Sequence, residues 1–408
     1  MIVNALLASA AVLGSADKAV EVPFILGDDA IIAKAVVNGR EVSCMFDTGF
    51  SGSFVLTDQI NIGKPSGSMT LRDFVGEFQA QTTPIKTLAL GSQKINCEDM
   101  AAVQQPGNSY TLSYNTHTVG IMGLEVMQDF VLEINFEKKK FILHPQTFDF
   151  TQWKPDNKKT FMAKMAAKGM NSIELQVETS NGKKMNLALD TGNAFYGTTH
   201  KDVLERLGIW PQGQKPNFMS TAFVASGAVD SWYMAMNDLK IFGVPVPNSI
   251  WSIIDLPSSS VSHDGTVGFG FLKNFNIIID QKRRRVWLDN FSGQVADPPM
   301  ASAGLSAWFY DEYDRFVVTN VTPGGPAAKA GIRRGDMILG VNDEEALNIG
   351  PRAFMRLMEG PQGSKVKLSL SRGGVLNNFE ITREYLFNGK IQQTGSQPAA
   401  ASAGSAGQ

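Results

Sequence analysis

The tripeptide Asp-Thr-Gly occurs twice, as Asp47-Thr48-Gly49 and Asp190-Thr191-Gly192, and each copy ends a short apolar run. Hydrolysis of a peptide bond by water needs a base that takes a proton from the water and an acid that protonates the substrate. Two carboxyl groups about 3 Å apart cannot both ionise, so they share one proton and supply both functions. We therefore predict one site in which Asp47 and Asp190 act as base and acid.

The sequence around the two tripeptides is repeated as well. Asn38-Gly39 and Asn181-Gly182 each lie upstream, with the glycine eight residues before the aspartate. Asn-Gly between apolar runs indicates a β-hairpin, because both central residues of a type I′ turn need positive φ. The predicted strand pairs are 31–37 with 41–46 and 173–179 with 184–189.

The repeat continues downstream of each tripeptide. Gly120-Ile121-Met122-Gly123 corresponds to Gly265-Thr266-Val267-Gly268, and the basic run 138–140 corresponds to 283–285. Both basic runs fall between predicted strands, so we interpret them as solvated turn residues. Such self-similarity indicates an internal duplication.

This order of motifs, in two copies on one chain, resembles the aspartic endopeptidases, in particular bacterial retropepsin-type domains joined into a pepsin-like bilobal enzyme. The resemblance covers residues 20 to about 291. It implies a mainly β fold with two β-barrel-like lobes of the acid protease type, related by a pseudo-twofold axis, with the aspartates meeting at a cleft. It also implies that Thr48 and Thr191 lock the two loops together by hydrogen bonds across that axis. Gly49 and Gly192 let the backbone turn closely beside its partner.

One position departs from the family pattern. The residue after each glycine is Phe50 or Asn193, where the family usually has Ser, Thr or Ala. Neither carboxylate is then expected to receive a side-chain hydroxyl hydrogen bond. Losing a donor to the charged form favours the protonated form, so we predict activity that extends towards neutral pH.

Two hairpin tips are candidates for flaps over the substrate, 74–78 with Gly76 and 224–228 with Gly227. Neither carries the Tyr-Gly pair of the pepsin flap, so an ordinary hairpin tip is an equal alternative for each. Between them, residues 201–207 are predicted to form a helix that Thr198 or Thr199 caps and Gly208 ends.

A third unit follows a predicted linker at 292–303, which is rich in Pro and small residues. The string from Gly325 to Asp336 is similar to that of PDZ domains attached to bacterial periplasmic proteases, and implies a small α+β PDZ domain over 304–388. Such domains add an extended peptide to a sheet edge and hold its terminal carboxylate. The candidate residues are Leu305, Ser306, Ala307 and Trp308, in a loop before the first strand. The alternative is a PDZ fold that only packs against the protease.

Bulk properties limit the remaining functions. The chain has 408 residues, enough for two or three domains. Its formal net charge of −2 gives no reason to expect nucleic acid as a partner. Residues 1–19 resemble a signal peptide that lacks the usual basic start, so we predict a periplasmic or secreted protein, or a cytoplasmic one if this segment is no signal. The tail 389–408 is predicted to be disordered. We expect a monomer without a stable membrane span.

Neither cofactor nor metal is expected. The four histidines are scattered without the spacing of zinc ligands. Cys44 and Cys97 allow one disulfide in an oxidising compartment, whereas a buried free thiol is the favoured state for Cys44.

Two functions from different classes follow. The favoured one is an aspartic endopeptidase that acts on protein or peptide substrates through Asp47 and Asp190, with the PDZ unit recruiting or regulating the substrate. The alternative is an inactive bilobal scaffold that binds proteins through its PDZ unit. A scaffold has no reason to keep two desolvated carboxylates that repel each other, which favours the enzyme.

Overall fold

The computed structural model describes residues 18–72, 77–105, 116–150, 153–166, 173–210, 218–224, 227–258, 263–310 and 313–386. The chain is mainly β, with 51% of residues in strands and 9% in helices, which confirms the predicted class at that level. The assignment of its halves to pepsin-like lobes stays a prediction. The tail 389–408 and the first 17 residues of the predicted signal segment lie outside the described residues.

The first half contains the first predicted hairpin. Strands β2 and β3 pair antiparallel with Val37 opposite Arg40, and Asn38 and Gly39 both have positive φ, 48° and 79°, as a type I′ turn requires. The strands are β1 (Val20–Gly27), β2 (Ala30–Val37), β3 (Arg40–Asp47), β4 (Phe54–Thr57), β5 (Gly67–Arg72), β6 (Glu77–Pro84), β7 (Leu88–Leu90), β8 (Gln93–Ile95), β9 (Ala101–Gln105), β10 (Gly120–Gly123), β11 (Val131–Asn135) and β12 (Lys140–His144), with the 3-10 helix η1 (Leu124–Met127).

The second half contains the second predicted hairpin, β14 with β15. Its turn differs from the prediction: Gly182 has φ 76° while Asn181 has no positive φ. The loop is longer, and the Thr179 hydroxyl donates to the Asn181 side chain. The elements are β13 (Thr160–Lys164), β14 (Glu174–Glu178), β15 (Lys184–Leu189), β16 (Gly197–His200), α1 (Lys201–Leu207), β17 (Met219–Val224), β18 (Gly227–Ile241), β19 (Val244–Ile254), β20 (Gly265–Val267), α2 (Phe269–Leu272), β21 (Asn276–Asp280) and β22 (Arg285–Asp289).

The predicted helix is present as α1 and ends at Gly208, which has φ 69°. Its N-cap is His200, without a side-chain cap hydrogen bond, so the predicted threonine cap is wrong. Thr199 instead donates to the carbonyl oxygen of Asp264.

The two halves repeat one strand arrangement next to the tripeptides. Strand β10 is parallel to β3 and antiparallel to β4, and β20 is parallel to β15 and antiparallel to β16. A Cβ on Gly120 would lie 2.0 Å from the carbonyl oxygen of Val55, and one on Gly265 would lie 2.2 Å from that of Thr198. The first glycine of each Gly-x-x-Gly run therefore permits this close approach of two backbones.

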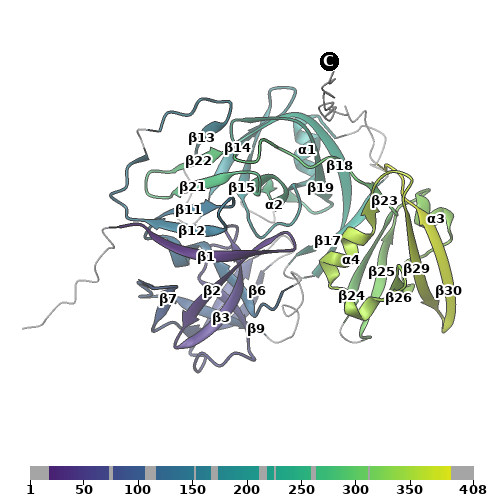
Figure 1. Cartoon of the computed structure of the whole chain (residues 1–408), viewed down its shortest axis with the longest axis horizontal. Helices are drawn as coiled ribbons and strands as arrows, with labels where there is room; N and C mark the ends of the chain where they lie inside the picture. Colours follow the sequence, from purple (N-terminus) through teal and green to yellow (C-terminus); the bar gives the residue numbers. More distant parts are fainter. Residues whose placement is uncertain are drawn as a thin grey trace, which may run out of the picture.

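The halves are joined by a shared sheet and a common core. Strand β11 pairs antiparallel with β21, with Glu133 opposite Ile278, and the two lie side by side in Figure 1. One cluster of buried apolar side chains contains residues of both halves, such as Phe46 and Phe271. Residues 20 to about 291 thus pack as one body.

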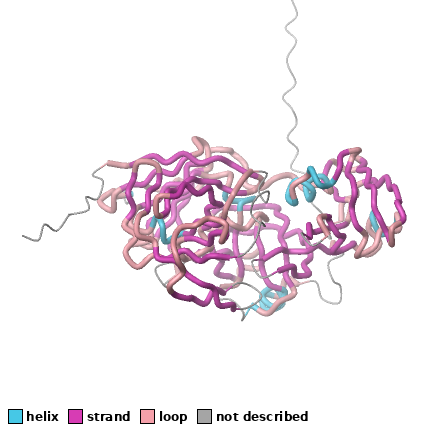
Figure 2. Tube along the Cα trace, turned by 90° about the horizontal axis from the view of Figure 1, so that it is seen from below, coloured by secondary structure: helices cyan, strands magenta, loops and turns pink. Residues whose placement is uncertain are grey.

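The C-terminal unit has its own core, in which the rings of Phe316 and Phe354 stack 4.8 Å apart. It projects to one side of the molecule (Figures 1 and 2). Its main sheet has the order β24-β25-β26-β29-β30. The elements are β23 (Ala301–Ser302), which lies within the predicted linker, β24 (Leu305–Tyr310), β25 (Arg315–Val321), α3 (Pro326–Lys329), β26 (Met337–Val341), β27 (Glu344–Glu345), η4 (Ala346–Asn348), α4 (Pro351–Leu357), β28 (Glu359–Gly360), β29 (Lys365–Arg372) and β30 (Val375–Thr382).

Candidate active site and PDZ domain

The two Asp-Thr-Gly loops meet through their threonines. The hydroxyl oxygen of Thr48 accepts a hydrogen bond from the backbone N–H of Thr191 (3.0 Å) and donates to the carbonyl oxygen of Leu189 (2.7 Å). The Thr191 hydroxyl makes the reciprocal bonds to the N–H of Thr48 (3.1 Å) and the carbonyl of Phe46 (2.8 Å). Both threonines are buried, 3% and 0% exposed. Four hydrogen bonds in a dry environment therefore fix one loop against the other.

This arrangement brings the two aspartates together. The carboxyl groups of Asp47 and Asp190 lie close enough for each to affect the pKa of the other. Asp47 Oδ1 accepts from the backbone N–H groups of Gly49 (2.7 Å) and Phe50 (3.2 Å). In the other loop, Asp190 Oδ1 accepts from the backbone N–H groups of Gly192 (2.9 Å) and Asn193 (3.0 Å). The two copies of the sequence repeat thus place their carboxyl groups in nearly equivalent hydrogen-bonding environments.

The side chains of Phe50 and Asn193 do not replace the missing hydroxyl donors. The amide nitrogen of Asn193 donates to the hydroxyls of Thr198 (3.1 Å) and Thr266 (2.7 Å), away from the carboxyl pair. What these two residues supply is a backbone N–H each. Reasoning from side-chain types missed this contribution, because every residue except proline carries that donor.

The two glycines of the motif lie against the opposite carboxyl group. A Cβ on Gly49 would lie 2.7 Å from Asp190 Cγ, and one on Gly192 would lie 2.5 Å from Asp47 Cγ. Both distances are far below van der Waals contact. Only glycine therefore fits without moving the carboxyl groups.

We expect Gly192→Ala to lower any activity that depends on the carboxyl pair at least about tenfold, because a displacement of functional groups by about 1 Å can cost about 10²-fold. A matched control is Gly182→Ala, which has positive φ but open space around the added methyl group. The control tests the cost of a strained glycine away from the site. Equal activity of the two variants would contradict the tight fit at Gly192.

Desolvation by burial raises the pKa of both Asp47 and Asp190. For Asp190 the neighbouring negative charge of Asp47 raises the pKa further. Both side chains keep partial exposure, in contrast to the buried threonines beside them. The raised pKa values favour one shared proton between Asp47 and Asp190. Because both residues are partly exposed, this proton can exchange with solvent or with a bound molecule.

The raised pKa values also predict how stability depends on pH. A folded state with raised carboxyl pKa values binds more protons than the unfolded chain, so stability falls as pH rises above the unfolded value of about 3.9 and through the folded values. We expect Asp190→Asn to flatten this fall, because it removes the ionisable partner. Thermal unfolding of both proteins between about pH 4 and pH 8 tests this. Parallel curves for the two proteins would contradict it.

The flap candidates have different outcomes. Gly76 lies outside the described residues, although the strands that lead to it, β5 and β6, pair with Arg72 opposite Glu77. Gly227 pairs with Val224 in the β17–β18 hairpin. Strand β17 of that hairpin contacts the C-terminal unit, as described below. A role of either residue over substrate stays a prediction.

The predicted peptide-binding loop of the C-terminal unit is a strand. Residues 305–308 form the start of β24, which is the terminal strand of its sheet and, among the strands that the structure describes, pairs only with β25. Leu305 and Ala307 point into the core. The Ser306 hydroxyl lies 3.1 Å from that of Thr221 on β17, so this side chain belongs to a contact between units. The expected loop is therefore wrong, and the free edge of β24 takes its place as the candidate.

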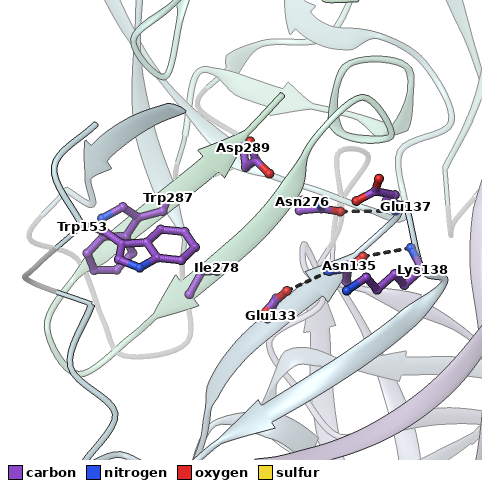
Figure 3. Close-up of a pocket in the computed structure, with 9 residues that line it drawn as sticks. All are labelled: Glu133, Asn135, Glu137, Lys138, Trp153, Asn276, Ile278, Trp287 and Asp289. Atoms are coloured by element: carbon purple, nitrogen blue, oxygen red, sulfur yellow. Dashed lines mark hydrogen bonds between the residues drawn. The ribbon is translucent and has the colours of Figure 1, made fainter. Parts of the chain in front are cut away.

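A separate pocket of about 230 Å³ lies on the sheet that joins the halves. Figure 3 shows Trp153 and Trp287 at one end and Glu137 and Lys138 at the other. Neither aspartate of the pair lines it. The pocket is thus distinct from the candidate active site.

Two further predictions concern the cysteines and a membrane span. Cys44 is buried and free, Cys97 is half-buried and free, and burial raises the pKa of the Cys44 thiol. Within the described ranges, no helix is long and apolar enough to cross a membrane.

A family model described as PDZ domain matches residues 317–372, from β25 to the end of β29. Those strands form the sheet whose edge is β24. The C-terminal unit is a PDZ domain. This confirms that part of the sequence-based prediction, and it suggests that the protein binds a peptide or protein.

Two curated relatives are peptidases. Carboxyl-terminal-processing peptidase 2, chloroplastic, of Arabidopsis thaliana is 40% identical over 68 residues, 17% of this chain and 13% of that protein. Carboxy-terminal processing protease CtpA of Bacillus subtilis (strain 168) is 34% identical over 82 residues, 20% of this chain and 18% of that protein. The chain thus spans less than a fifth of the length of these relatives. A solved structure, the photosystem II D1 C-terminal processing protease, is 27% identical over 22% of this chain and 24% of that chain, with a TM-score of 0.21.

The relatives contradict one prediction. We expected an aspartic endopeptidase, with an inactive scaffold as the alternative, whereas both relatives are carboxyl-terminal processing peptidases. The assignment to the aspartic type is corrected accordingly. The coarser prediction of a peptidase, and therefore a hydrolase, agrees with the relatives.

Proposed function

We propose that this protein is a peptidase that receives polypeptide substrates through its PDZ domain. The PDZ domain and the peptidases among its relatives support the substrate class. A free edge strand can bind an extended chain by adding it to the sheet. Because the names of the relatives refer to carboxyl-terminal processing, we infer that the bound segment lies near the C-terminus of the substrate.

We also propose that Asp47 and Asp190 belong to a functional site of this protein. The observation that carries this proposal is the close approach of the two Asp-Thr-Gly loops, held in place by the reciprocal hydrogen bonds of Thr48 and Thr191. A pair of neighbouring carboxyl groups can take up and release a proton.

Incubation of the full chain with a peptide library, followed by mass spectrometry of new termini, tests the proposal. We expect cleavage products whose yield falls when the C-terminal carboxylates of the library are amidated. A lack of products from any peptide would overturn the peptidase assignment. Equal yields from free and amidated libraries would overturn the inferred role of the substrate C-terminus alone.

A further inference from the structure

The turn between β1 and β2 reaches the PDZ domain. Asp28 and Asp29 lie between β1 and β2, and both bind Arg356 of α4: its Nη1 lies 2.9 Å from Asp28 Oδ1, and its Nη2 lies 2.9 Å from Asp29 Oδ1. Arg352, one turn earlier on α4, donates to the backbone carbonyl of Asp29 (3.4 Å). We call these four residues the hairpin latch. In Figure 1 the tip of this hairpin points towards α4.

The PDZ domain is also held at a second contact of a different nature. The hydroxyls of Thr221, Ser306 and Thr319 form a buried cluster, and the side-chain nitrogen of Asn320 donates to the carbonyl of Ser220 and to Asp230. Four of these bonds join uncharged groups that water does not reach, and three of the four connect the PDZ domain to β17. This contact is suited to hold the domain permanently.

The hairpin latch is suited to open. The Arg356 side chain is 51% exposed, and the side chains of Asp28 and Asp29 are 16% and 30% exposed. Exposed ion pairs contribute little and are screened by salt. The two contacts therefore differ in how readily a ligand can compete with them.

The helix that carries the arginines lies beside the candidate peptide-binding edge. Strand β24 is the free edge of the PDZ sheet, and α4 packs next to it. Guanidinium groups bind carboxylates in a bidentate geometry. A peptide that adds to β24 and carries acidic side chains would thus meet Arg356 and Arg352. The same arginines are now occupied by the chain's own acidic turn.

The hairpin links the latch to the candidate active site. Strand β2 starts directly after Asp29, and its residues Ile32–Val37 pair with Arg40–Met45 of β3, which ends at Asp47. A release of the Asp28-Asp29 turn would therefore alter the position of β2 and, through the β2–β3 pairing, that of β3, which ends at Asp47. This path is short and consists of backbone hydrogen bonds.

We propose that the Asp28-Asp29 turn is an internal acidic ligand of the PDZ helix α4, and that an acidic segment of a bound polypeptide displaces it. This inference rests on the peptide-binding part of the proposed function and is independent of hydrolysis. The PDZ domain then selects polypeptides with acidic residues near the bound end, and binding releases the β1–β2 turn from α4.

Fluorescence anisotropy of two labelled peptides tests the competition on the full chain. The peptides have the same sequence and a free C-terminus, and one carries Asp-Asp where the other carries Asn-Asn. We expect the double variant Asp28→Asn/Asp29→Asn to bind the acidic peptide about five- to tenfold more tightly than the wild type does, because Arg356 is freed. The Asn-Asn peptide should bind both proteins equally. Asp58→Asn, an exposed change in the same half, serves as the matched control.

Arg356→Gln keeps a polar, unbranched side-chain stem but removes the charge. We expect it to abolish the preference for the acidic peptide, and thermal unfolding checks that the domain remains folded. Hydrogen exchange of residues 30–37 should increase when the acidic peptide binds the wild type. Unchanged affinity in the Asp28→Asn/Asp29→Asn variant, a retained acidic preference in Arg356→Gln, or no binding of either peptide at about 1 mM would overturn the proposal.

Discussion

Replacing Asp47 or Asp190 by asparagine is expected to lower kcat for polypeptide hydrolysis by about 10²- to 10⁴-fold, the range typical of losing a general acid or base. Asparagine keeps the size of the side chain and cannot exchange a proton. Because the two carboxyls act as one unit, the double variant should be no less active than either single variant. KM should change little, since the PDZ domain that we propose to receive the polypeptide is untouched. Initial rates on a peptide taken from the library experiment measure each of these quantities.

The stability of these variants distinguishes a chemical role from a structural one. Each removes one ionisable group from a pair whose pKa values are raised by burial, so we expect unfolding free energies at pH 7 equal to or above that of the wild type. Asp58→Asn controls for a change of charge at an exposed position. Hydrolysis that survives in both variants and is blocked by a fluorophosphonate would place the reaction on a serine and reject the carboxyl pair.

Much of the region around the carboxyl pair was predictable because its signals are local. An Asn-Gly turn requires positive φ at two positions, and Asn38 and Gly39 have it. The stop signal at Gly208 likewise works within one helical turn. The repeat then indicated which distant segments are equivalent, although it could not show that their side chains touch. That contact depends on the packing of two strand ends, β3 and β15, which no local pattern encodes.

Other features depended on long-range contacts and were missed or misplaced. Residues 305–308 were taken for a loop, but they pair with β25 and therefore extend as a strand. The Asp28-Asp29 turn drew no attention, because acidic turns are common on protein surfaces. Its significance comes from Arg356, more than three hundred residues away along the chain. The class of peptidase was misjudged for a related reason: a motif predicts the groups at a site, whereas family relationships come from comparison with other proteins.

Thr48→Val is expected to lower the free energy of unfolding by about 2–6 kcal/mol, because it leaves two buried backbone groups without partners, at about 1–3 kcal/mol each. These are the carbonyl of Leu189 and the N–H of Thr191. Valine has nearly the shape of threonine, so the change removes the hydroxyl and little packing. Urea denaturation followed by tryptophan fluorescence measures the difference.

Two controls make this result specific to the contact between the loops. Thr48→Ser keeps the hydroxyl and should recover most of the lost stability, whereas Thr70→Val, at an exposed strand position, should change it by less than about 0.5 kcal/mol. Thr191→Val should resemble Thr48→Val, and the double variant should cost less than the sum of both, since the two hydroxyls serve one shared contact. Additive losses would mean that each threonine stabilises only its own loop. In that case the four hydrogen bonds would not hold Asp47 and Asp190 together, and the carboxyl pair would need another explanation for its geometry.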